Sequence, residues 1–174
     1  MVSSNFLKTY FFFFAITFLV IFLDQASKTL IFRTLYLGQS IPILGDFFKI
    51  TYILNPGGAF GTKLGGNNFY TILSIVAIVL TFLFFLHTKR DQLLVKISLA
   101  LILGGAIGNL IDRFKFGQVI DFLDFDFFNI NIPPFKLGFI DFAGFYLDRW
   151  PVFNLADSSV SIGAGLIILQ MFRA

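Results

Sequence analysis

The chain contains no cysteine and no glutamate, and His87 is its only histidine. The lack of cysteine excludes disulfides, thiolate nucleophiles and cysteine-ligated metals, and every acidic side chain is an aspartate. His87 lies near Lys89 and Arg90 in a short polar stretch, where we expect an exposed residue rather than a base or a ligand. We therefore expect no metal and no cofactor, although a hard-cation site built from aspartates alone stays open.

Charged residues are also scarce, at 13% of the 174 residues, whereas 57% are hydrophobic and the mean hydropathy is +0.85. A soluble domain carries roughly twice that charged fraction. The net charge of +3 is small, and the basic residues are scattered along the chain. We therefore expect membrane lipids as partners and no nucleic acid. The composition predicts a single integral membrane domain that covers residues 1–174.

Four apolar segments are long enough to cross a bilayer, which takes about 20 helical residues. Small residues in the third and fourth segments would let their backbones approach closely. We take the first segment as a span rather than a cleavable signal peptide, because no small-x-small cleavage site follows it. The expected spans are about 10–28, 69–87, 93–111 and 153–172, and the outer loops are about 29–68 and 112–152. The predicted fold is an all-α polytopic membrane protein with four transmembrane helices.

The orientation follows from the basic residues near the span ends. Four spans place both termini on one side, and the loop from His87 to Asp91 on that side is short and basic. Lys8 and Arg173 flank the ends of the first and last spans. The positive-inside rule then predicts that both termini are cytoplasmic.

Both outer loops carry recognisable patterns. The stretch from Phe47 to Leu54 is rich in aromatic and β-branched residues and is followed by Asn55-Pro56-Gly57-Gly58, which predicts a strand and a turn. We expect a small β-rich cradle on the outer surface. The second loop is rich in aromatic residues, which suit the headgroup interface. Its segment 125–149 either covers the site or rests on the membrane surface.

Asp121 follows the third span and Asp157 begins the fourth, and these spans run in opposite directions. Both carboxylates should therefore lie near the same membrane face. Two carboxylates brought together can share one proton and activate a water molecule between them. Asp124 and Asp126 are rivals for the role of Asp121, but Asp124 lies on a different side of an extended segment.

Asp24 and Lys28 are spaced i,i+4 on the first span, so they share a helix face and can pair. A functional role and a structural ion pair explain this spacing equally well. Ionisable residues near a membrane span are by default candidates for function.

Three further polar residues lie near the same ends of the spans. Asn109 and Arg113 repeat the i,i+4 spacing, and an arginine offers a planar fork of donors that can hold peptide carbonyls. Asn154 lies three residues before Asp157, where either residue could be only a helix cap. The convergence of these groups in an apolar setting favours a site.

Five segments, in this order, resemble the motifs of the bacterial signal peptidase II family, the prolipoprotein signal peptidases. They are Asp24-Gln25-Ala26-Ser27-Lys28, Asn55-Pro56-Gly57-Gly58-Ala59-Phe60, Gly105-Ala106-Ile107-Gly108-Asn109-Leu110-Ile111-Asp112-Arg113, Val119-Ile120-Asp121-Phe122 and Phe153-Asn154-Leu155-Ala156-Asp157-Ser158. The segment from Phe125 to Arg149 departs from the pattern, because it is longer than the usual connection.

The resemblance implies an intramembrane aspartyl endopeptidase of the bacterial cytoplasmic (inner) membrane whose active site faces outward. Such enzymes remove the signal peptide from diacylglyceryl-modified prolipoproteins by cutting before the lipidated cysteine, and globomycin-type inhibitors block them. The implied catalytic residues are Asp121 and Asp157. The implied substrate-binding residues are Asn55, Gly58, Asn109, Arg113 and Asn154, with Asp24 and Lys28 in support. We expect a monomer.

Three other functions compete with this interpretation. An ion- or proton-coupled small transporter would also keep aspartates in a helix bundle, but it should hold them near the bilayer midplane. A non-catalytic membrane scaffold is the second alternative. A serine–lysine protease is the third, although Ser27 and Lys28 are adjacent on a helix and point apart.

Overall fold

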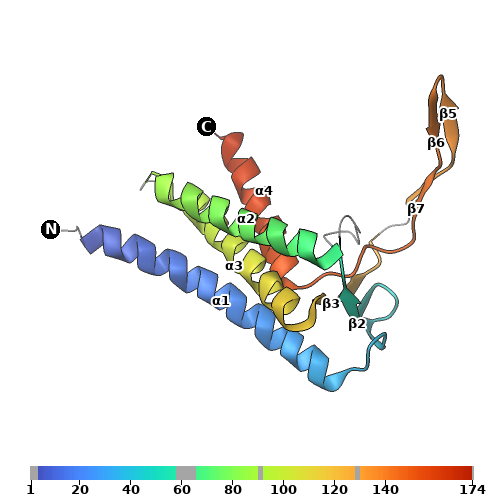
Figure 1. Cartoon of the computed structure of the whole chain (residues 1–174), viewed down its shortest axis with the longest axis horizontal. Coiled ribbons are helices and arrows are strands. Elements are labelled where there is room, and N and C mark those ends of the chain that lie inside the picture. The colour runs from blue at the N-terminus through green and yellow to red at the C-terminus, as the bar shows by residue number, and fades with distance from the viewer. Residues whose placement is uncertain (1–3, 58–65, 90–91, 128–129, 174) are drawn as a thin grey trace.

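The computed structural model describes residues 4–57, 66–89, 92–127 and 130–173. In these ranges the chain forms a bundle of helices, with the β structure gathered beyond one end of it (Figure 1). Helix α3 packs against each of the other three helices. The helices are α1 (Ser4–Thr34), α2 (Gly66–His87), α3 (Leu93–Phe116) and α4 (Leu155–Met171).

Three helical segments in the described part of the chain are long and apolar enough to cross a membrane. They are Tyr10–Thr34, Asn67–His87 and Leu93–Phe116. The fourth expected span corresponds to α4, which is apolar but has only 17 residues. Helix α1 extends past both ends of the predicted span 10–28, since no glycine or proline interrupts it.

Glycines set the distance between α3 and α4, as the small residues of these segments predict. A Cβ atom on Gly105 would collide with the carbonyl oxygen of Ala156. One on Gly163 would lie 2.7 Å from the carbonyl oxygen of Ser98. The close approach of the two helices therefore requires glycine at both positions.

A three-stranded antiparallel sheet lies next to the bundle (Figure 1). Its strands, in spatial order, are β1 (Ser40–Leu44), β2 (Phe48–Asn55) and β3 (Val119–Phe125). Strand β2 confirms the strand predicted at 47–54. Helix α3 ends at Gly117, whose φ of 69° suits glycine, and β3 begins two residues later. A hydrophobic cluster of Ile31, Tyr52, Ile120 and Phe122 joins α1 to this sheet.

The long segment after β3 forms a hairpin arm that the sequence analysis did not predict. Strand β4 (Ile130–Ile132) pairs with β7 (Phe145–Leu147), and β5 (Phe135–Leu137) pairs with β6 (Ile140–Phe142), both antiparallel. The two pairs are nested, so residues 130–147 form one ribbon, which we call the arm. Figure 1 shows the arm extending away from the helix bundle at the end where the sheet lies.

Candidate active site

Asp121 lies on β3 and Asp157 lies in the first turn of α4, and two asparagines connect them. The Asn154 side chain donates hydrogen bonds to Asp121 (2.7 Å) and to Asn109 Oδ1 (3.0 Å). The Asn109 side chain in turn donates to Asp157 (2.8 Å). Four side chains from three elements thus form one connected polar chain. The structure brings together both aspartates predicted to be catalytic.

Asn154 serves both as a helix cap and as part of this polar chain. Its Oδ1 accepts the N–H of Asp157 at 2.9 Å, and the Asp157 carboxylate accepts the N–H of Asn154 at 3.3 Å, which completes a capping box. The amide nitrogen of the same side chain remains available for Asp121. The cap and the site, which were alternatives from the sequence, are therefore compatible.

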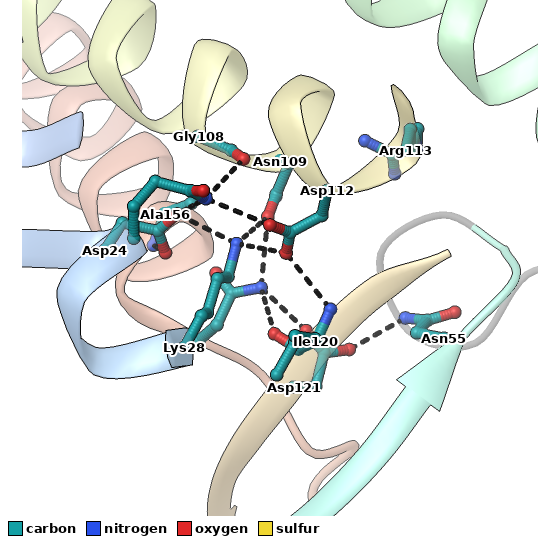
Figure 2. A network of polar contacts seen from close by, with 12 residues as sticks. Asp24, Lys28, Asn55, Gly108, Asn109, Asp112, Arg113, Ile120, Asp121 and Ala156 are labelled. Carbon is teal, nitrogen blue, oxygen red and sulfur yellow. Dashed lines mark hydrogen bonds and ion pairs between the residues drawn. The ribbon is translucent and has the colours of Figure 1, made fainter. Parts of the chain in front are cut away.

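Asp121 is only 1% exposed, and each of its carboxylate oxygens accepts a hydrogen bond. Asn154 donates to one oxygen, and Asn55 at the end of β2 donates to the other at 3.0 Å (Figure 2). Burial, followed by the negative charge of Asp157, raises the pKa of Asp121 to about 7. The two asparagines oppose this rise, since they stabilise the ionised form. The aspartate pair can therefore hold one proton near neutral pH.

Asp157 borders two cavities. One, of about 400 Å³, lies between α2, α3 and α4 and is lined by Asn109, Arg113 and Ser161 among others. The second, of about 350 Å³, has largely apolar walls that include Phe127 and Trp150. The carboxylate is therefore accessible from two directions. Ser161 lines both cavities and was missed from the sequence, although it lies one helical turn after Asp157.

Arg113 lines the first of these cavities but does not join the polar chain of the aspartates. Its guanidinium donates to Ser74 of α2 at 3.2 Å and to the carbonyl of Gly57 at 3.4 Å. The N–H of Gly57 donates to the Asn55 side chain at 2.9 Å. Gly58, also predicted to bind substrate, lies outside the described residues.

Asp24 and Lys28 lie beside Asn109 of the polar chain (Figure 2). The Lys28 ammonium lies 2.9 Å from each of three oxygens, which belong to Asp24, Asp112 and Asn109. Asp24 is 0% exposed, so this is a fully buried ionic cluster. Lys28 thus contacts the polar chain of the two aspartates through Asn109.

The two buried acids of this cluster hold backbone groups of the site. Asp24 accepts the N–H of Ala156 at 3.0 Å, and Asp112 accepts the N–H of Ile120 at 3.1 Å (Figure 2). Ala156 and Ile120 immediately precede the two candidate catalytic aspartates. Because Lys28 pairs with both acids, it is connected through them to the backbone of Ala156 and of Ile120.

Gln25 is a further residue that the sequence analysis did not assign to the site. Its side chain donates to Asp112 at 2.9 Å and to the carbonyl of Gly108 at 3.1 Å, which links α1 to α3. Gly108 allows this approach, since a Cβ atom there would lie 2.5 Å from Asp24. Adjacency to Asp24 was the only sequence signal for Gln25.

Asp124, the rival of Asp121, has different partners. It accepts hydrogen bonds from Thr51 at 2.6 Å and from Arg149 at 2.9 Å, and Arg149 also reaches Asp126 at 3.3 Å. These contacts hold the strand and the base of the arm together. Within the described residues, no group of three or more histidine, cysteine or acidic side chains could hold a metal ion.

Comparisons with known proteins match nearly the whole chain. Residues 16–173 match the protein family described as Signal peptidase (SPase) II. A lipoprotein signal peptidase from Halothermothrix orenii is 39% identical over 155 residues, which cover 89% of this chain and 91% of the relative. One from Desulforapulum autotrophicum is 40% identical over 159 residues, covering 88% and 86%. A solved structure of a bacterial membrane enzyme is 31% identical, with a TM-score of 0.76 over 92% of this chain and 87% of that one.

Proposed function

Because this chain belongs to the signal peptidase II family, we propose that Asp121 and Asp157 are the catalytic pair with which it removes signal peptides from lipoprotein precursors. The observation that carries this assignment is the hydrogen-bonded path from Asp121 through Asn154 and Asn109 to Asp157. The path holds two acids together at the end of the bundle, beside cavities large enough for a peptide. A transporter would instead keep its carboxylates near the middle of the helices.

The reaction follows from one proton shared by two carboxylates. The ionised aspartate takes a proton from a water molecule while the water oxygen attacks the scissile carbonyl carbon. The protonated aspartate donates to the carbonyl oxygen as charge develops there. When the carbon–nitrogen bond breaks, the proton taken from water passes to the leaving amine. One hydroxyl of the intermediate returns its proton to the aspartate that had donated to the carbonyl oxygen, so the new carboxyl group forms and the pair again holds one proton. Neither a cofactor nor a metal ion takes part in this sequence.

The substrate contacts are proposed for the polar residues that line the site. Asn109 and Arg113 line the cavity between α2, α3 and α4, and the Arg113 fork suits the carbonyl groups of an extended peptide. Asn55 and Asn154 hold the Asp121 carboxylate. Gly58, which lies outside the described residues, is proposed as a further substrate contact from the family resemblance alone. A globomycin-type inhibitor would act by occupying the aspartate pair.

The membrane placement is proposed from the four helices and the basic residues. At 1.5 Å per residue, the 17 residues of α4 extend about 26 Å, close to the thickness of about 30 Å for the hydrocarbon core. We take α4 as a fourth span. Four spans put both termini in the cytoplasm, given the basic loop that starts at His87, and direct the aspartate pair outward. The enzyme would act as a monomer surrounded by membrane lipids.

Asp121→Asn and Asp157→Asn test the assignment. Asparagine keeps the size of aspartate and most of its hydrogen bonding, but it cannot share or move a proton. General acid–base groups contribute typically about 10²–10⁴-fold, so each variant should lose cleavage by at least that factor. Residues that act as a unit are not additive, and the double variant should be little worse than either single one. The measurement is cleavage of a diacylglyceryl-modified precursor by purified protein in detergent.

Asp124→Asn is the matched control, because Asp124 lies on the same strand but binds Thr51 and Arg149. It should keep activity within about tenfold, which is roughly 1.4 kcal/mol of barrier. An inactive Asp124→Asn beside an active Asp121→Asn would mean that the pair is wrongly assigned. Activity in all three single variants would refute the aspartic mechanism.

A further inference from the structure

The arm consists of two hairpins without any third strand. In the described structure β4 pairs only with β7, and β5 pairs only with β6. An isolated two-stranded hairpin is marginally stable in water, because neither face packs against a core. The arm also extends away from the helix bundle (Figure 1). Its stability therefore calls for another surface, on at least one of its faces.

The outer part of the arm, formed by β5 and β6, is amphipathic. Residues directly opposite in register share a face, and alternate residues along each strand change face. Phe135 pairs with Phe142, their ring centroids lie 5.0 Å apart, and Leu137 has the same parity as Phe135. Lys136 pairs with Asp141 on the other face, where the two form a 3.0 Å ion pair. One face is thus apolar, and the charges on the other neutralise each other.

The tip and the inner hairpin follow the same pattern. Gly138 has a φ of 59° and opens a two-residue turn, which leaves Phe139 at the tip with 100% of its surface exposed. In the inner part of the arm, formed by β4 and β7, Ile132 pairs with Phe145. The neighbouring pair of Asn131 and Tyr146 lies on the other face. Exposed aromatic rings therefore continue along the length of the arm.

The base of the arm is fixed on the sheet. The Arg149 guanidinium binds Asp124 at 2.9 Å and Asp126 at 3.3 Å, and the N–H of Trp150 donates to the carbonyl of Phe125 at 3.2 Å. These contacts lie at the end of β3 that is farther from α3. A clamp at the base gives the arm a defined direction relative to the bundle and therefore to the membrane.

We propose that the arm lies on the bilayer surface at the end of the bundle that carries Asp121, with its apolar face in the headgroup region. The helices of this chain cross the membrane, so a lipid surface is always present beside the arm's base. Aromatic rings settle at the boundary between headgroups and hydrocarbon, and the neutral Lys136–Asp141 face can remain in water. This occupant accounts for the apolar face, the exposed tip and the clamped base together, and it does not depend on the catalytic assignment.

The absence of cysteine allows a direct test with the whole protein. Phe139→Cys, labelled with a polarity-sensitive fluorophore, is placed in nanodiscs that hold one copy of the protein. The discs contain phosphatidylethanolamine and phosphatidylglycerol, with or without lipids spin-labelled just below the headgroup. The tip probe should show blue-shifted emission and lose most of its intensity to the spin-labelled lipid. Asp46→Cys, in the exposed turn between β1 and β2, is the control and should lose far less.

Each other outcome overturns the proposal. Water-like emission at the tip, quenched by iodide as strongly as at Asp46→Cys, would place the arm in solution. A blue shift that appears only in discs with two copies would assign the face to a second chain. A variant with Phe135→Ser and Leu137→Ser should weaken lipid quenching at the tip, and unchanged quenching would show that this face is not the one in contact. None of these readouts requires cleavage, so failure here is distinct from failure of the catalytic assignment.

Discussion

The buried cluster of Asp24, Lys28 and Asp112 lies next to the proposed catalytic pair. Lys28→Met tests whether the cluster consists of ions that hold the helices together. Lys28 as a whole residue is 1% exposed, and its ammonium lies 2.9 Å from oxygens of Asp24, Asp112 and Asn109. Methionine keeps the apolar stem but removes the charge and the three donors. The two carboxylates keep their backbone partners and lose the cation that they share.

The expected loss of stability follows from the charge left behind. Two carboxylates and one ammonium carry a formal charge of −1, and the substitution makes this charge −2 at the same buried place. Breaking a buried pair by removing one partner costs about 3–5 kcal/mol. Lys28 has two acidic partners, so we expect the upper end of that range. The ratio of folded to unfolded protein should then fall by roughly three orders of magnitude, at about 1.4 kcal/mol per tenfold.

Stability is measured as resistance to unfolding by sodium dodecyl sulfate in mixed micelles, followed by circular dichroism. Lys49→Met is the control, because Lys49 and its partner Asp46 have side chains that are 25% and 89% exposed. An exposed pair contributes about 0–1 kcal/mol, so this variant should change little.

A second substitution should restore much of the stability that Lys28→Met loses. Adding Asp24→Asn returns the formal charge of the cluster to −1, and the asparagine oxygen can still accept the N–H of Ala156. A loss below about 1 kcal/mol in Lys28→Met, the value of a surface pair, would refute the ionic description. Equal instability of the single and double variants would refute it as well.

Two further predictions concern the catalytic pair and its orientation. The pKa of Asp121 is raised to about 7, so the pair keeps its shared proton below that pH and loses it above. On the alkaline side, kcat/KM should therefore fall by about tenfold per pH unit. A value of kcat/KM that stays constant from pH 6 to 9 would contradict a shared proton. For the orientation in the membrane, Asp46→Cys should react with an impermeant thiol reagent in intact cells, whereas Lys89→Cys and Arg173→Cys should not. Labelling of Lys89→Cys without labelling of Asp46→Cys would show that the chain has the opposite orientation.

The sequence predicted those parts of the fold that depend on local pattern. The aromatic and β-branched stretch before Asn55 forms β2, and the long apolar runs form helices. The positions of Asp121 and Asp157 at the ends of neighbouring segments were enough to place them together, because consecutive antiparallel spans bring those ends together. The Asn109–Arg113 spacing, by contrast, did not predict that the two side chains have different partners. In the structure Asn109 joins the aspartates, while Arg113 binds Ser74 and Gly57.

The arm could not be predicted in the same way. Each of its strands has three residues, too few for alternation to distinguish a strand from a loop, and Pro133 and Pro134 interrupt the run between the first two. Its register depends on the pairing of residues up to 17 positions apart, such as Ile130 with Leu147. The partners of Gln25 on α3 were equally hidden, since they lie more than 80 residues away.

The architecture behind the catalytic pair explains why the pair should respond as a unit. The backbone immediately before each of the two aspartates proposed as catalytic is held by a buried acid, one from α1 and one from α3. The single ammonium of Lys28 pairs with both acids and also binds Asn109, the asparagine that contacts Asp157. A shift of α1 relative to α3 would therefore displace Asp157 relative to Asp121, or break one of these two backbone contacts. It follows that damage to the cluster should lower the rate for every precursor alike, because it alters the pair rather than the contacts with any particular peptide.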